Sequence, residues 1–354
     1  MKLLVPSYYD GFRCAASACP DNCCIGWEIC IDGDTLKKYS LVPGPFGERL
    51  RKNIKDGSFV LNNERCPFLN ERGLCDIIIN LGEDFLCGIC ARHPRFAEQY
   101  GDMTEAGLGL ACQSAAELIL NSALSGYFRE TDTDDGSRVF GYIENDDDPE
   151  LLALFLKMRG LLFSAAENAP SFTVAAASIL TASSDFQGQY DRGIIDLPAD
   201  SERYFSGIKK NVPPKPGLMG RYTEFLRGLE PIGADWSRLI CCPSLEKVRP
   251  VSDFGRHGRR LLYYFIFRYF LKSFFTGDIY LNTAFGVFSS FYIVQMLSAN
   301  ALGLLGRKYE PREICSLYSK QMEYSQENMD SFFLESERNP DFSSENLIRL
   351  ILET

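Results

Sequence analysis

The sequence lacks the excess of basic residues that nucleic-acid-binding proteins carry. It contains 37 Lys and Arg against 47 Asp and Glu, which gives a formal net charge of −10. Phosphate backbones are bound by clustered Lys and Arg, so a general nucleic-acid-binding surface is not expected. The negative charge suits a basic or neutral partner, although it also serves solubility on its own.

A secretory signal is also missing from the start of the chain. The first residues, MKLLVPSYYDGFRC, offer three apolar residues before Pro6, with neither a longer apolar core nor a small-residue cleavage site. We therefore expect a cytoplasmic protein, whose thiols are kept reduced. In that compartment the 13 cysteines are more readily metal ligands than disulfide partners.

Several familiar motifs are absent as well. Strand patterns are scarce, and CDIIIN (residues 75–80) is the clearest candidate. The triplet Gly107-Leu108-Gly109 has no third glycine, so the doubly wound methyltransferase fold is not indicated. A zinc ribbon needs two CxxC pairs and only Cys87–Cys90 has that spacing, while the CxxxCxxC signature of radical S-adenosylmethionine enzymes does not occur.

What the sequence does have is cysteine, concentrated near the N-terminus. Ten of the 13 fall within the first 112 residues, namely Cys14, Cys19, Cys23, Cys24, Cys30, Cys66, Cys75, Cys87, Cys90 and Cys112. Thiolates bind soft metal ions and iron–sulfur clusters, and such sites commonly take four of them. The pattern therefore predicts a metal or cluster site in this third of the chain, and the spacing does not decide which metal it holds.

Two of these cysteines are adjacent. Neighbouring side chains point in divergent directions in most backbone conformations, so we expect Cys23 and Cys24 to serve different atoms or different sites. The second pair, Cys241–Cys242, has no further cysteine nearby and is interpreted as a packing feature.

Four ordered blocks point to a family. They are CPDNCCIGWEICID (residues 19–32), RCPFLNERGLCDI (65–77), CARHPRF (90–96) and GLGLACQSAAELIL (107–120). Together they resemble the flagellin lysine-N-methylase family, which shares a CxxCxxCC zinc- or iron-chelating module with small bacterial proteins. The resemblance is close over about the first 125 residues and rests beyond them on length and helical character.

The resemblance implies a set of metal ligands, which are Cys14, Cys19, Cys23, Cys24, Cys66, Cys75, Cys90 and Cys112. Eight thiolates are enough for one four-ligand cluster plus a second site or supporting hydrogen bonds, and Cys30 and Cys87 are additional. The family pattern also matches Trp27, Asp32, Arg92, Pro94 and Arg95. His93 stands where an aromatic residue is expected, and whether it ligates anything is open.

The function implied by the resemblance is methylation of a protein lysine, with flagellin as the family's named substrate. Its cofactors would be S-adenosylmethionine and a cysteine-bound iron–sulfur cluster of the 4Fe-4S type, or zinc. The alternative is a non-catalytic protein whose zinc or iron module is structural, sensing or metal-carrying. The extra helical domain favours the enzyme because it offers room for a substrate site; neither the catalytic residues nor the methyl-donor site can be assigned.

The predicted architecture is mainly α, with a loop-rich cysteine module over residues 1–128, an acidic linker or loop over 129–150 and a helical domain over 151–354. Asp148 and Pro149 predict a helix start, and PSFTVAAASILTASSD another helix. Residues 279–306 carry no charge, yet Asn282, Gln295 and interrupting glycines favour buried helices over a membrane span. A peripheral membrane contact through the basic residues near Arg256 stays open. PREICSLYSKQMEYSQEN and SSENLIRLILE predict two C-terminal helices.

Overall fold

The computed structural model describes residues 2–124, 127–131, 148–208, 213, 215–243, 245–248 and 252–353. Within these ranges the protein is mainly α-helical, as predicted. Most of the predicted acidic linker, residues 132–147, lies outside them, and the predicted domain boundaries stay predictions.

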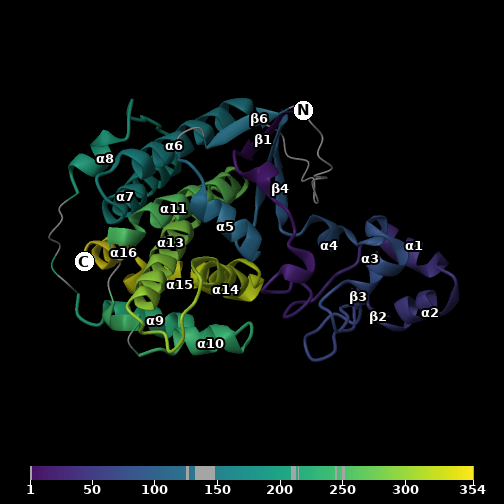
Figure 1. The fold of residues 1–354 in the computed structure, drawn as a ribbon. Helices are drawn as coiled ribbons and strands as arrows, with labels where there is room; N and C mark the ends of the chain where they lie inside the picture. The colour runs from purple at the N-terminus through teal and green to yellow at the C-terminus, as the bar shows by residue number, and fades with distance from the viewer. Residues whose placement is uncertain are drawn as a thin grey trace.

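A small lobe stands out from one side of a larger helical body (Figure 1). We use the term small lobe for residues 24–92. Its elements are α1 (Gly33–Leu41), α2 (Gly44–Lys52), β2 (Ile54–Lys55), β3 (Ser58–Phe59), α3 (Asp76–Leu81) and α4 (Gly88–Arg92). The lobe has its own core, centred on the rings of Tyr39, Phe59 and Phe68 and separate from the main core.

The helical body surrounds a buried central helix. Its helices are α5 (Gln113–Asn121), α6 (Pro149–Asn168), α7 (Phe172–Asp191), α8 (Glu202–Ser206), α9 (Leu218–Gly228), α10 (Ala234–Ile240), α11 (Gly255–Tyr269), α12 (Ser273–Thr276), α13 (Ile279–Ala301), α14 (Pro311–Glu323), α15 (Gln326–Arg338) and α16 (Ser344–Leu352). The uncharged tract predicted to be buried forms α13, which is covered along nearly its whole length. No helix in the described ranges is long and apolar enough to cross a bilayer.

Local signals account for where several helices begin. Asp148 accepts hydrogen bonds from the amides of Glu150 and Leu151, and Pro149 occupies the first helical position of α6, as predicted. Ser343 caps α16 in the same way. The segment predicted as one helix before it forms two, because Tyr324 and Ser325 separate α14 from α15 and Ser325 caps the latter.

A four-stranded sheet that the sequence analysis did not predict lies beside the helices. It comprises β1 (Lys2–Pro6), β4 (Arg95–Tyr100), β5 (Met103–Leu108) and β6 (Phe128–Thr131), in the order β4-β5-β1-β6. β1 runs parallel to β5 and antiparallel to β6, and β4–β5 is a hairpin that turns at Gly101 and Asp102. The strand predicted at residues 75–80 was wrong: these residues form α3 instead, with Ile77 buried and Ile79 exposed.

The basic residues at the start of α11 are engaged with the protein itself. Arg259 donates hydrogen bonds to the carbonyls of Ala166, Glu167 and Ala169 at the end of α6, and Arg260 donates to the carbonyl of Leu120 at the end of α5. Positive side chains stabilise helix C-termini in this way. These two arginines therefore have a structural role.

One glycine allows α11 and α13 to pack closely. A Cβ atom at Gly286 would lie 2.8 Å from the Cβ of Phe265. We expect Gly286→Ala to lower the free energy of unfolding by about 1–3 kcal/mol, because the two helices would have to separate. Gly160→Ala, on an exposed part of α6 with open space around it, is the control and should stabilise the protein by about 0.5–1 kcal/mol. Urea denaturation followed by circular dichroism measures both; equal effects would contradict the packing explanation.

Candidate functional site

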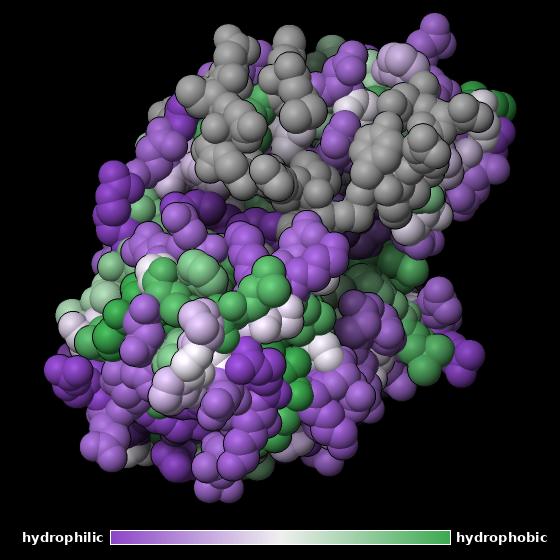
Figure 2. All heavy atoms as spheres, turned by 90° about the vertical axis from the view of Figure 1, so that its right-hand side faces the viewer, coloured by the Kyte–Doolittle hydropathy of each residue, from purple (hydrophilic) through white to green (hydrophobic). Residues whose placement is uncertain are grey.

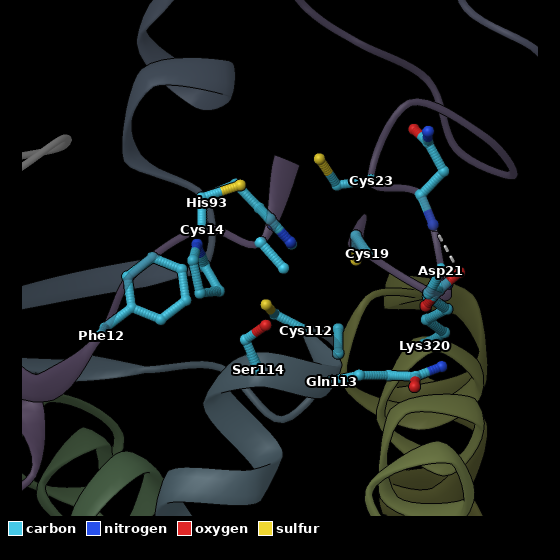
Figure 3. A pocket seen from close by; sticks show the side chains of 14 residues that line it. Phe12, Cys14, Cys19, Asp21, Cys23, His93, Cys112, Gln113, Ser114 and Lys320 are labelled. Carbon is cyan, nitrogen blue, oxygen red and sulfur yellow. Dashed lines mark hydrogen bonds and ion pairs between the residues drawn. The ribbon is translucent and has the colours of Figure 1, made fainter. Parts of the chain in front are cut away.

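Four predicted ligands line one pocket. Cys14, Cys19 and Cys23 come from the loop that precedes the small lobe, and Cys112 comes from the start of α5 (Figure 3). We call these four the pocket thiols. The pocket encloses about 50 Å³, which suits a compact inorganic group and is far smaller than the cavities that hold whole organic cofactors.

The ligand loop is fixed to α14 by a charged pair. Lys320 Nζ lies 2.6 Å from Asp21 Oδ2, and both side chains line the pocket. Ser316, one turn earlier on α14, donates hydrogen bonds to the Asp21 carboxylate and to the Ala111 carbonyl. Burial opposes ionisation of Asp21, but the charge of Lys320 and the hydrogen bonds from Lys320, Asn22 and Ser316 together outweigh it and lower the pKa of that carboxyl. A helix of the body therefore holds the loop beside Cys112.

An aromatic group adjoins the pocket. Trp27 stacks on Tyr324 with ring centroids 5.5 Å apart, and His93, a pocket-lining residue, lies 5.5 Å from Trp27. Trp27 Nε1 donates to the carbonyl of Cys23, and Lys320 Nζ lies 5.4 Å from the centre of the Trp27 ring. Burial, together with the charge of Lys320, lowers the pKa of His93 to about 4. His93 is thus neutral near pH 7 and faces the pocket thiols.

A buried charge network lies behind Tyr324. Arg268 Nε lies 3.3 Å from Glu323 Oε2, which also accepts hydrogen bonds from the hydroxyls of Tyr264 and Tyr269. The Arg268 side chain is therefore turned inward and paired. Gly109 makes room for it, because a Cβ there would lie 2.5 Å from the Tyr324 hydroxyl oxygen and 3.1 Å from an Arg268 nitrogen.

The other predicted ligands lie elsewhere. Cys24, Cys66, Cys75 and Cys90 belong to the core of the small lobe, and Cys87 joins them there. We call these five the lobe thiols. Cys30 is exposed, with Ser58 Oγ donating to its Sγ at 3.5 Å. Of the second pair, Cys242 packs against the main core as the packing interpretation requires, whereas Cys241 is exposed and does not.

Other residues matched by the family pattern have structural roles. Asp32 caps α1 through the Thr35 amide and also accepts a hydrogen bond from the Gly88 amide at the start of α4. Arg95 lies over the rings of Tyr9 and Phe12. Both residues tie the cysteine-bearing segments to their surroundings, and neither lines the pocket.

The donor chemistry of the pocket fits a thiolate-bound group. All 13 cysteines are free thiols, but no three His, Cys, Asp or Glu side chains in the described ranges are arranged around a single ion. A lone zinc ion draws its four sulfurs within about 2.3 Å of itself. A cubane cluster instead gives each iron its own cysteine and keeps the sulfurs apart around the cluster. The four pocket thiols match the donor type and the number that either group requires.

Sequence reasoning missed the residues of the body that complete the site. Lys320, Ser316 and Tyr324 follow Asp21 by about 300 residues, and they lie in a segment that was predicted only to form a helix. Asp21 lies in the segment 19–32 that carries the family resemblance, but the sequence assigned it no role. Polar residues on the buried side of α14 were the one sequence feature that could have indicated a role for this helix in the site.

Comparison with known proteins shows to which family the chain belongs. The chain is 32% identical over 130 residues to the flagellar biosynthetic protein FliU of Salmonella muenchen, an alignment that covers 33% of this chain and 75% of FliU. The chain belongs to the FliU family. It is also 32% identical over 130 residues to the lysine-N-methylases of Salmonella typhimurium strain LT2 and Salmonella choleraesuis strain SC-B67.

The relationship to these two relatives of the FliU family is partial. The alignment covers 33% of this chain and 32% of each methylase, so the chain matches about a third of their length. No family model matches the chain. No solved structure matches it either.

Proposed function

We propose that the protein methylates lysine side chains of a protein substrate, with S-adenosylmethionine as methyl donor and a 4Fe-4S cluster bound by the pocket thiols. The observation that carries the proposal is the convergence of Cys14, Cys19, Cys23 and Cys112 on one pocket in a member of the FliU family. The names of the lysine-N-methylases support the reaction, and the name of FliU supports a flagellar substrate such as flagellin. The proposal places the reaction in the cytoplasm, where thiols stay reduced.

The reaction requires a neutral amine and a cationic donor. In net terms the carbon–sulfur bond of the sulfonium breaks with its electron pair left on sulfur, and a carbon–nitrogen bond forms from the lysine lone pair. The amine proton goes to solvent. A bound cluster would supply iron as a site of electron transfer or substrate coordination. The pocket is too small for the whole donor, so only its reacting end would reach the pocket thiols.

The surroundings of the pocket suit positively charged reactants. Aromatic faces attract cations, and Trp27 already lies near the Lys320 ammonium. The Asp21 carboxylate adds a negative charge at the same edge, kept ionised by its partner. We therefore assign Trp27, Tyr324 and Asp21 to orienting the cationic ends of donor and substrate, with Lys320 holding Asp21 in place.

The test combines composition and activity on one anaerobic sample. We expect iron and acid-labile sulfide in near-equal amounts, and transfer of labelled methyl from S-adenosylmethionine to lysines of flagellin. Heat-denatured protein and flagellin with acetylated lysines are the controls. Iron and sulfide without methyl transfer would refute the enzyme and leave a cluster-carrying protein. A colourless protein with zinc alone would refute the cluster and favour the non-catalytic alternative.

A further inference from the structure

The small lobe is joined to the helical body at two places, and the first lies between the adjacent cysteines. Cys23 lines the pocket (Figure 3), whereas Cys24 belongs to the lobe core. The Cys24 carbonyl accepts a hydrogen bond of 2.8 Å from the Cys66 amide, which ties Cys24 to the lobe. On the other side, Asp21 is tied to the body by Lys320. The first connection thus changes from body to lobe at residues 23 and 24.

The second connection is equally short. The His93 amide donates to the Ile89 carbonyl of α4 at 3.0 Å, so His93 continues the last turn of the lobe. The Pro94 carbonyl accepts a hydrogen bond of 2.7 Å from the Gly109 amide of the body. His93 and Pro94 also line the pocket. Because both connections form part of the pocket wall, a rotation of the lobe about them would move that wall relative to Cys112 at the start of α5.

The lobe and the body have separate hydrophobic cores. The two sets of buried side chains do not merge in the described ranges, and the lobe stands out to one side of the body (Figure 1). The face that carries the lobe is largely hydrophilic, with apolar side chains scattered over it (Figure 2). Units that are not held by a large apolar interface are expected to move relative to each other. The orientation of the lobe therefore depends on particular contacts at its base.

Trp27 makes such contacts. Its ring stacks on that of Tyr324 in the body, with centroids 5.5 Å apart and planes at 23°, and it lies 5.5 Å from the ring of His93. Its Nε1 donates to the Cys23 carbonyl at 2.9 Å, and Lys320 Nζ lies 5.4 Å from the ring centre. This one side chain of the lobe therefore contacts both connections and the body. We call the stacking of Trp27 on Tyr324 the latch.

The body side of the latch is fixed by its neighbours. The Arg268 guanidinium lies 5.5 Å from the centre of the Tyr324 ring and is itself paired with Glu323 at 3.3 Å. The backbone at Gly109 packs directly against the Tyr324 hydroxyl, since a Cβ there would lie 2.5 Å from its oxygen. Trp27 is thus the partner that moves when the lobe rotates. A stacked ring pair is a modest interaction, so the latch can be released without unfolding either unit.

We propose that the small lobe is a hinged arm, held by the latch, and that release of the latch opens the pocket to a protein substrate. The hinge lies at residues 23–24 and 93–94, because hinges are formed by a few residues in loops or at the ends of elements. The pocket encloses about 50 Å³, which is too little for a methyl donor and a lysine side chain together, so their entry requires the wall to move. The opening to substrate rests on the proposed function, whereas the hinge and the latch do not.

Energy transfer between two dyes on the full-length protein tests the hinge. One dye is placed at Leu41 of the lobe, which is 81% exposed, and the other at Leu302 of the body, which is 58% exposed. Both are attached through genetically encoded azides, since 13 cysteines prevent selective thiol labelling. We expect one narrow population in single-molecule measurements on the native chain. Trp27→Ala should shift molecules to a second, broader population, and Trp27→Phe, which keeps a ring to stack, should retain the native one.

Two controls separate the latch from a general loss of structure. Phe275→Ala removes a stacked pair within the body, in which the rings of Phe275 and Tyr100 lie 5.4 Å apart, and it should keep the native population. A second dye pair at Ile194 and Leu302 lies wholly in the body and should report no change in Trp27→Ala. A change in both dye pairs would mean that the variant unfolds, and would overturn the latch.

The remaining outcomes distinguish this inference from the proposed function. A native population in Trp27→Ala would overturn the latch. Flagellin added to the native labelled protein should increase the second population. Flagellin that is methylated without any change in energy transfer would refute the opening step and leave the proposed function intact. Absence of methyl transfer would refute the proposed function and the substrate step with it, while the Trp27 variants still decide whether the lobe is hinged and latched.

Discussion

Replacing Cys19 and Cys112 together by serine is expected to remove the iron and the sulfide from the protein and to reduce methyl transfer to background. The two residues approach the pocket from different segments, so their loss takes away two of four thiolates while the other two remain. Changes to groups that merely support a metal ligand cost about 10–100-fold in affinity, and loss of ligands should cost at least as much.

The measurement is iron and sulfide content with the visible absorption of the same sample. Cys241→Ser provides a matched control, since that thiol is exposed and does not line the pocket. Circular dichroism should show that the double variant keeps its helices, because the main core does not depend on Cys19. Iron retained at the native level would rule out the pocket as the cluster site.

Breaking the buried ion pair between β5 and α6 is expected to give the largest loss of stability. Arg159 and Glu105 form two hydrogen bonds, of 2.7 and 2.5 Å, and their side chains are 4% and 3% exposed. Glu105→Gln should lower the free energy of unfolding by about 3–5 kcal/mol, because the Arg159 charge would stay buried without a counterion.

A double variant distinguishes the cost of leaving one charge unpaired from the contribution of the ion pair itself. Glu105→Leu combined with Arg159→Met removes both charges, and we expect it to recover most of the loss, since an apolar pair of similar volume avoids the cost of burying charge. Thermal and urea unfolding of the single and double variants measure the coupling between the two positions. A loss below about 1 kcal/mol in both single variants would show that the pair is dispensable.

Helix positions were predictable where the signal is local. Asp148 and Pro149 mark the start of α6 whatever lies around them, and the uncharged tract of α13 can only be buried or inserted in a membrane. The strand at residues 75–80 was predicted from its three isoleucines. The prediction failed because β-propensity mostly reflects packing against neighbouring strands. In the described ranges this segment has no neighbouring strand and instead forms a helix that packs Ile77 into the lobe core.

The sheet and the site depend on contacts that no short stretch encodes. The hairpin β4–β5 has a turn signal at Gly101-Asp102 that could have been recognised. The pairing of β1 with β5 joins residues about a hundred positions apart, and the Asp21–Lys320 pair joins residues 299 apart. The cysteines as candidate ligands were therefore evident from the sequence, whereas their division into pocket thiols and lobe thiols needed the fold.

The place of β1 in the sheet has a consequence for how the chain is made. Its partners β5 and β6 follow it by about a hundred residues or more, so during synthesis the first strand emerges long before it can pair. The small lobe lies wholly between β1 and β5 and is complete before β5 is translated. We expect the lobe to fold first on the ribosome, with metal capture possible at that stage, and the sheet to close afterwards around an already formed insertion.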